Sequence, residues 1–146
     1  MAGIVGVVLA LDQATKSWAV ATLVDGRTIP LFWTFELDLA LNPGFAFSQG
    51  TGLTGLITVV GLVLVAGLVW WSRGATSPLM ASGLALLLGG ACGNLADRLF
   101  RDHGGAVVDF IDPEWWPVFN VADIAVFFGA ALLILSSIRE PTAATP

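Results

Sequence analysis

Four long apolar segments dominate the sequence, and short polar segments separate them. They cover approximately residues 3–24, 53–71, 78–97 and 119–138. Each is close to the ~20 residues that a helix needs to cross the hydrocarbon core of a bilayer. Apolar residues occur on nearly every side of each segment, as expected for helices surrounded by lipid and by one another. The pattern therefore predicts four transmembrane helices.

The connection between the second and third apolar segments is very short. Only the six residues 72–77 (SRGATS) separate them, so these two helices are expected to form an antiparallel hairpin. Adjacent tryptophans are typical of the two membrane–water interfaces. Two such pairs fit the two sides of the predicted membrane region: Trp70 with Trp71, and Trp115 with Trp116.

Residues 29–41, between the first two apolar segments, have a different pattern. Every odd position is apolar, and this period of two indicates a strand with one buried face. The segment ends at Asn42-Pro43-Gly44, a turn signal. A second extended segment, residues 106–111, is expected to pair with it and to point Asp109 away from its apolar neighbours. We therefore expect a small β-sheet at the outer membrane surface, with its apolar face turned to lipid or substrate.

The composition supports an integral membrane protein. The chain has 146 residues, of which 56% are hydrophobic and 12% charged, whereas soluble domains carry about 25% charged residues. The length fits a single membrane domain, residues 1–146. The net charge of −5 and the few basic residues argue against a nucleic-acid partner. The positive-inside rule does not decide the orientation of the chain, because the two sides of the membrane would have equal numbers of these basic residues. Arg73 and Arg139 would lie on one side, and Arg27 and Arg101 on the other.

The first apolar segment contains two charged residues, Asp12 and Lys16. They are four apart, so on a helix they share a face and can neutralise each other. The pair is expected to be a structural ion pair; the alternative role is to fasten this helix to other buried polar groups. Ala19-Val20-Ala21 resembles a signal-peptidase cleavage site. Because the charged pair interrupts the apolar stretch before it, we expect a retained transmembrane helix.

The third apolar segment combines small residues with a polar face. Gly89 and Gly93 have the small-xxx-small spacing that lets two helices approach closely. Beyond them, Asn94, Asp97 and Arg98 stand at i, i+3 and i+4 and share one face near the end of the helix.

The fourth segment begins with a matching polar pair, Asn120 and Asp123, which are three residues apart. Antiparallel neighbours place this start at the same depth as the polar end of the third segment. We therefore expect a pocket at the outer membrane boundary, formed by Asn94, Arg98, Asn120, Asp109 and Asp123.

Two close carboxylates favour acid–base chemistry, because both cannot ionise cheaply and they tend to share a proton. One can activate a water while the other protonates a carbonyl or a leaving amine. The nearby Asn and Arg side chains would position a peptide or stabilise an oxyanion. The only histidine, His103, lies in a hydrophilic loop, so a Ser–His pairing is not expected. No His or Cys cluster is available, and neither a metal nor another cofactor is expected.

The chain resembles the lipoprotein signal peptidase (signal peptidase II) family. Five motifs in order carry the resemblance over nearly the whole chain: DQATK (12–16), NPGFAFS (42–48), GGACGNLADR (89–98), VVDF (107–110) and FNVAD (119–123). The resemblance implies a bacterial aspartyl endopeptidase with four membrane helices and a small extracytoplasmic β-cradle. It also implies that both termini are cytoplasmic, so that residues 25–52 and 98–118 lie outside the cytoplasmic membrane.

The resemblance also implies a function and roles for residues. Such an enzyme cuts diacylglyceryl-modified prolipoproteins just before the lipidated cysteine, works among membrane lipids and binds globomycin-type inhibitors. Asp109 and Asp123 would form the catalytic dyad, with Asn42, Asn94, Arg98 and Asn120 holding the peptide and supporting it. The resemblance implies that Gly44 and Gly93 are needed for the backbone geometry and that Phe45 and Phe47 line the entrance to the site. It also implies that Asp12 and Asp97 are framework residues, and Asp97 would pair with Arg98 or Lys16.

Other functional classes fit the sequence less well. A small proton-coupled transporter could use buried Asp and Arg as a relay, but four spans without a repeat leave little room for alternating access. A non-catalytic membrane subunit would need no convergence of polar groups. Presenilin-like proteases also use two membrane aspartates, but their GxGD block is absent from the sequence.

Overall fold

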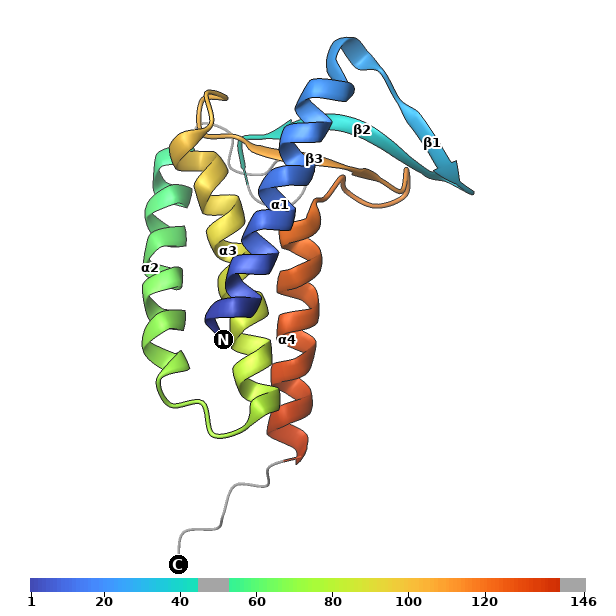
Figure 1. Ribbon diagram of the computed structural model, residues 1–146. Helices are drawn as coiled ribbons and strands as arrows, with labels where there is room; N and C mark the ends of the chain where they lie inside the picture. The colour runs from blue at the N-terminus through green and yellow to red at the C-terminus, as the bar shows by residue number, and fades with distance from the viewer. Residues whose placement is uncertain (45–52, 140–146) are drawn as a thin grey trace, which may run out of the picture.

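The computed structural model describes residues 1–44 and 53–139, which form a helical bundle with a small sheet over one end (Figure 1). A single turn of 3₁₀ helix, Val24–Gly26, joins the first helix to the sheet. The helices of the described chain are α1 (Ala2–Thr22), α2 (Thr54–Ser72), α3 (Pro78–Phe100) and α4 (Val121–Arg139), and its strands are β1 (Ile29–Phe32), β2 (Phe35–Asn42) and β3 (Val107–Asp112).

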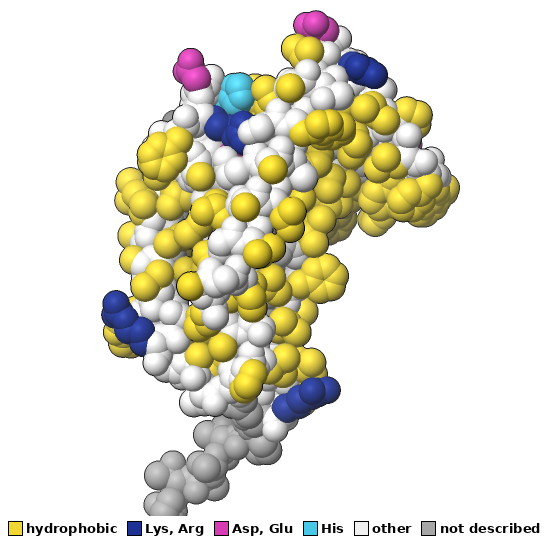
Figure 2. All heavy atoms as spheres, in the orientation of Figure 1, with side chains coloured by type: hydrophobic (Ala, Val, Ile, Leu, Met, Phe, Trp, Pro, Cys, Tyr) yellow, Lys and Arg dark blue, Asp and Glu magenta, His cyan; other side chains and the backbone are white. Residues whose placement is uncertain are grey.

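All four of these helices are long and apolar enough to cross a membrane. Hydrophobic side chains cover the middle of the bundle, and the basic side chains on the surface, all of them arginines, lie towards its two ends (Figure 2). On α2 only Ile57 is buried, so most of this helix is left to face lipid. The predicted fold class, a multi-pass helical membrane protein with a small β-sheet, is confirmed.

α3 packs against the other three helices, and its glycines allow close approach to α1. A β-carbon added to Gly89 would lie 2.7 Å from the Val8 β-carbon, and one added to Gly93 would lie 2.5 Å from Asp12 Oδ2. Both distances are shorter than ordinary van der Waals contact. The predicted close approach at the Gly89–Gly93 pair is therefore present, and α1 is the helix that uses it.

A side-chain cap defines the start of α3, and the helix ends later than expected. Ser77 caps the start by accepting a hydrogen bond from the Met80 amide (3.2 Å), and Pro78 occupies the first turn, where its missing N–H is no loss. The helix continues past residue 97, where the apolar segment ends, to Phe100. Arg98 therefore lies on the helix and not in the following loop.

The single strand expected over residues 29–41 is wrong: these residues form a hairpin. β1 and β2 pair antiparallel, with Ile29 opposite Leu37, and the chain reverses at Trp33, which has φ 53°. The sequence gives no sign of this turn, because its two residues are Trp33 and Thr34 and not the Asn-Gly or Asp-Gly pair that favours two-residue hairpin turns. The Phe32 and Phe35 rings stack across the hairpin at 5.1 Å.

The predicted pairing with the second extended segment is confirmed. β2 and β3 pair antiparallel, with Ala40 opposite Asp109 and Leu41 opposite Val108. β2 is therefore the central strand of the three-stranded sheet. Figure 1 shows the β1–β2 hairpin projecting sideways beyond the helices. Apolar side chains are exposed on it, among them Leu31, Phe32 and Trp33.

We expect Gly93→Ala to destabilise the protein, because the new methyl group would overlap the Asp12 carboxylate. That carboxylate cannot move away easily, since Lys16 pairs with the same oxygen at 3.0 Å. Overpacking of this kind costs about 1–3 kcal/mol, which a lower thermal unfolding midpoint in detergent would report. Gly67→Ala on α2 is the control, because nothing lies within 4 Å of its added β-carbon. Equal midpoints for the two variants would contradict the packing described here.

Candidate active site

A fully buried ion-pair cluster joins α1 to α3. Lys16 Nζ lies 3.0 Å from Asp12 Oδ2 and 2.9 Å from Asp97 Oδ2, and all three side chains have no exposed surface. The same ammonium donates a hydrogen bond to Asn94 Oδ1 at 2.8 Å. The ion pair expected between Asp12 and Lys16 is present, and of the two partners left open for Asp97 the structure contains Lys16.

Two residues that the sequence did not single out complete this cluster. Arg101 pairs with Asp97 at 2.7 Å. The Gln13 side-chain amide donates to Asp12 (3.1 Å), to Asp97 (3.0 Å) and to the Gly93 carbonyl (3.1 Å). The i, i+4 spacing of Asp97 and Arg101 is a sequence signal that could have found the second pair. Gln13 gives no such signal, because its partners on α3 are far away in the sequence.

The buried carboxylates also hold the elements that carry the two candidate catalytic residues. Asp12 Oδ1 accepts a hydrogen bond from the Ala122 amide at 2.9 Å, in the first turn of α4. Asp97 Oδ2 accepts one from the Val108 amide at 3.1 Å, in β3. A carboxylate near a helix N-terminus is also favoured by the helix dipole. The cluster therefore fixes β3 and the start of α4 relative to α1 and α3.

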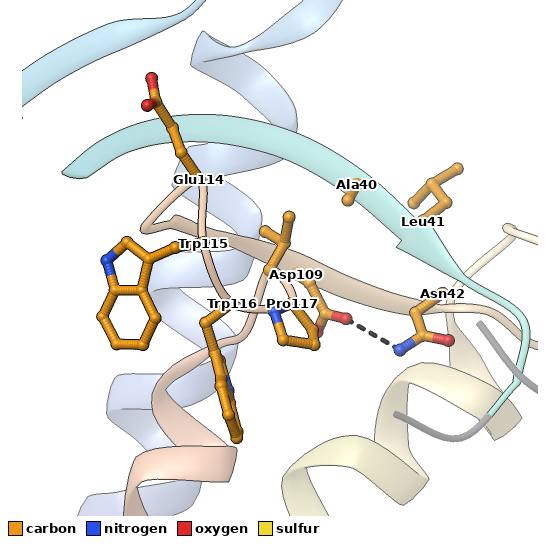
Figure 3. Close-up of a pocket in the computed structure, with 9 residues that line it drawn as sticks. Ala40, Leu41, Asn42, Asp109, Glu114, Trp115, Trp116 and Pro117 are labelled. Atoms are coloured by element: carbon orange, nitrogen blue, oxygen red, sulfur yellow. Dashed lines mark hydrogen bonds between the residues drawn. The ribbon is translucent and has the colours of Figure 1, made fainter. Parts of the chain in front are cut away.

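Asp109 is placed by β3 and held by two asparagines. Asn42, at the end of β2, donates to Asp109 Oδ2 at 3.1 Å, and Asn120 donates to Asp109 Oδ1 at 2.6 Å. Figure 3 shows the Asn42 amide reaching Asp109 from one side, with the Trp115 ring on the other. Only 3% of the Asp109 surface is exposed. Asn42 thus takes a supporting position that only the family resemblance implied.

Asp123 and Asn120 form a reciprocal cap at the start of α4. The Asp123 amide donates to Asn120 Oδ1 (3.0 Å), and the Asn120 amide donates to Asp123 Oδ2 (3.2 Å). This is the pattern of a capping box, with the carboxylate at the third helical position. Asn94 donates to the other oxygen, Asp123 Oδ1, at 2.8 Å. The backbone of the helix start therefore orients the carboxylate.

Asp109 and Asp123 line the same cavity, which has a volume of about 390 Å³. A neighbouring cavity of about 420 Å³ shares Asp109 and continues along the sheet edge to Glu114 and Trp115. The cavity of about 390 Å³ is bordered by both residues of the predicted dyad and by four of the five predicted support residues. The fifth support residue, Asn120, is fully buried. The polar lining residues are Asn42, Asn94, Arg98, Asp109 and Asp123, with Gly44 at the rim.

Arg98 uses two of its donors on the backbone. It donates to the Gly44 carbonyl at 2.6 Å and to the Gly105 carbonyl at 2.9 Å, so it joins the segment after β2 to the segment before β3. Gly44 also donates its amide to Asn42 Oδ1 at 3.1 Å. These contacts connect Arg98 to the position of Asn42. Phe45 and Phe47, expected at the entrance, lie outside the described residues.

Burial raises the pKa of Asp109 to about 6, and the nearby negative charge of Asp123 adds to the rise. Hydrogen bonds from Asn42 and Asn120 oppose it by favouring the ionised form. Asp109 can therefore hold or release a proton near neutral pH, as a group in general acid–base chemistry must. In residues 1–44 and 53–139, no group of three or more His, Cys, Asp or Glu side chains is placed to hold a metal.

Comparison with known proteins agrees with the motifs. The chain matches the family described as signal peptidase (SPase) II over residues 4–139. It is 51% identical over 136 residues to a lipoprotein signal peptidase of Rhodococcus jostii (strain RHA1), covering 90% of this chain and 69% of that protein. It is 48% identical over 135 residues to a lipoprotein signal peptidase of Mycobacterium avium (strain 104), covering 90% of this chain and 74% of that protein.

The fold is also similar to two solved structures of bacterial membrane enzymes obtained by the in meso method. One, at 2.3 Å resolution, superposes with a TM-score of 0.83 at 26% identity and covers 97% of this chain and 89% of its own. The other, at 1.9 Å resolution, has a TM-score of 0.80 at 26% identity, with coverages of 94% and 91%.

We expect Asp109 to make the folded protein less stable as the pH rises. Its pKa of about 6 lies above the ~3.9 of an unfolded aspartate, so proton binding favours the folded state. This contribution, on the order of 3 kcal/mol, is complete below about pH 4 and is lost as the pH rises through about 6. The unfolding midpoint in detergent should fall between pH 4 and 8, and fall less in Asp109→Asn. Parallel curves for the two proteins would contradict the raised pKa.

Proposed function

Because the chain belongs to the signal peptidase II family, we propose that it is an aspartyl endopeptidase that removes the signal peptide from prolipoproteins. The cut falls just before a cysteine that carries a diacylglyceryl group. The observation that carries this proposal is the cavity at one end of the membrane bundle, which Asp109 and Asp123 both line. Membership in a peptidase family favours this activity over the proton-coupled transporter.

In the proposed reaction the two carboxylates share one proton. The ionised carboxylate takes a proton from water, whose oxygen attacks the scissile carbonyl carbon, while the protonated one donates to the carbonyl oxygen. The aspartate that took the proton from water then donates it to the leaving nitrogen, while the other, now ionised, accepts a hydroxyl proton from the tetrahedral intermediate as the C–N bond breaks. Each aspartate accepts a hydrogen bond from an asparagine side chain, Asp109 from Asn42 and Asn120, and Asp123 from Asn94. These donors hold the carboxylates in place during the proton transfers.

The site also fits a substrate that is anchored in a membrane. A lipidated cysteine holds its peptide bond at the membrane boundary, so the acyl chains can stay in lipid while the peptide reaches the dyad. The exposed rings of Trp115 and Trp116 border the neighbouring cavity, Trp116 also borders the cavity with both aspartates, and both rings suit an interfacial position. In this proposal the sheet end of the bundle is extracytoplasmic and both termini face the cytoplasm. A globomycin-type inhibitor would occupy the same cavity.

We expect Asp109→Asn and Asp123→Asn each to reduce cleavage of a lipidated prolipoprotein by roughly 100-fold or more, because each removes one partner of the acid–base pair. Both variants should still insert into membranes, which fractionation would show. Asp102→Asn is the matched control, since Asp102 is an exposed aspartate in the loop after α3. Near-normal turnover by either dyad variant would disprove the assignment.

The lipid requirement can be tested separately with two forms of one precursor. Cleavage should be fast for the diacylglyceryl-modified form and at least tenfold slower for the unmodified form, because only the former is held at the membrane boundary. A globomycin-type inhibitor should block cleavage of the lipidated form. Gel-shift or mass-spectrometric detection of the released signal peptide measures both rates. Equal cleavage of the two forms would indicate a general membrane protease.

A further inference from the structure

Asn94 connects the buried ion-pair cluster to the candidate dyad. Its side-chain oxygen accepts hydrogen bonds from Lys16 Nζ at 2.8 Å and from Asn120 Nδ2 at 3.1 Å. Its side-chain nitrogen donates to Asp123 Oδ1 at 2.8 Å. One amide therefore contacts a cation on one side and a carboxylate on the other.

Lys16 determines which way round this amide lies. An amide can be turned over to exchange its oxygen and nitrogen, but an ammonium group only donates hydrogen bonds. The Asn94 oxygen must therefore face Lys16, which leaves its nitrogen to face Asp123. The same oxygen also receives Asn120, which donates to Asp109 at 2.6 Å. Hydrogen bonds thus lead from Lys16 to both aspartates with each donor and acceptor defined.

We propose that Lys16 is a positioning residue for the catalytic dyad and acts through Asn94. This role goes beyond fastening α1 to α3, and it rests on the function proposed above. Without the ammonium group, the hydrogen bond from Asn120 at 3.1 Å still holds the Asn94 oxygen, but the charged donor at 2.8 Å that opposes a turn of this oxygen towards Asp123 is lost. Such a turn would remove a donor from the carboxylate and place two acceptors against each other, which is unfavourable in a buried site.

Arg101 provides an internal comparison. Lys16 and Arg101 are both cations that pair with Asp97, at 2.9 and 2.7 Å. The other contacts of Arg101 are with Gln13 and Ser17 on α1, so it has no hydrogen bond to Asn94. Loss of either cation leaves Asp97 with one cationic partner. Only loss of Lys16 also removes a charged donor to Asn94.

The charges around the site predict how the pH profile responds. Lys16 faces Asp12 on its own helix and Asp97 on α3. The Lys16 charge opposes the rise in the pKa of Asp109. The other charged groups that interact with Asp109 are Asp123 and Arg98. Removing the Lys16 charge should therefore make the dyad retain its proton to higher pH. Both limbs of the plot of rate against pH should then lie at higher pH.

The first test compares Lys16→Met with Arg101→Met in cleavage of a lipidated prolipoprotein. For Lys16→Met we expect kcat to fall roughly 10- to 100-fold, the loss that accompanies removal of a hydrogen bond to a charged group. KM should change little, and the pH profile of kcat should shift to higher pH by on the order of one pH unit. Arg101→Met should show neither the loss of kcat nor the displaced profile.

A second pair of variants keeps the test valid where Lys16→Met fails to fold. Asp12→Asn/Lys16→Met removes one negative and one positive charge together, leaving Asp97 paired with Arg101. The asparagine oxygen at position 12 can still accept from the Ala122 amide, as Asp12 Oδ1 does. The double variant should have a lower kcat and a profile at higher pH than Asp12→Asn alone, because these two proteins differ only at Lys16.

Two results would overturn the inference: an unmoved pH profile on loss of Lys16 in either background, or an equal displacement in Arg101→Met. These measurements are distinct from the test of the proposed function. Dyad-dependent cleavage by the wild-type protein is established first with Asp109→Asn and Asp123→Asn. If cleavage depends on the dyad but not on Lys16, the proposed function stands and the positioning role fails.

Discussion

The rest of the structure depends on the neutralisation of a lysine buried inside the membrane bundle. An unpaired ammonium in this position would be prohibitively unfavourable, and Lys16 is matched by Asp12 and Asp97. The surplus negative charge of that trio is in turn met by Arg101. Among the described residues, no buried side-chain nitrogen or oxygen lacks a hydrogen-bond partner. Because every partner lies on another turn or another element, satisfying these charges also fixes how the helices pack.

The candidate site uses the same atoms for structure and for chemistry. Asp123 completes the first turn of α4 and lines the cavity, while its neighbour Asn120 caps that helix and also contacts Asp109. Asp97 supports β3 through the Val108 amide while it pairs with Lys16. Few additional residues are then needed to hold two carboxylates near each other. The arrangement also explains why so many polar groups gather at one end of an otherwise apolar bundle.

The sequence predicted the features that local pattern determines. Apolar length located the helices, and antiparallel helix order correctly placed Asp109 and Asp123 at one cavity. The hairpin turn at Trp33 was missed because its residues lack the usual turn chemistry. Gln13 was missed for another reason, since its role depends on contacts with a distant helix. Arg98 lines the cavity, as expected, and it also donates to two backbone carbonyls. Side-chain patterns in the sequence do not reveal which carbonyls lie near it, so these contacts could not be predicted.

The hydrogen bond from the Ala122 amide to Asp12 joins the first helix to the start of the last. The proposed dyad includes one residue from that last helix and one from the strand just before it. With only the first three helices in the membrane, the candidate site would therefore lack Asp123. Insertion of α4 would both close the bundle and supply this carboxylate. If the proposed function holds, the chain could enter the membrane before it could cut a substrate.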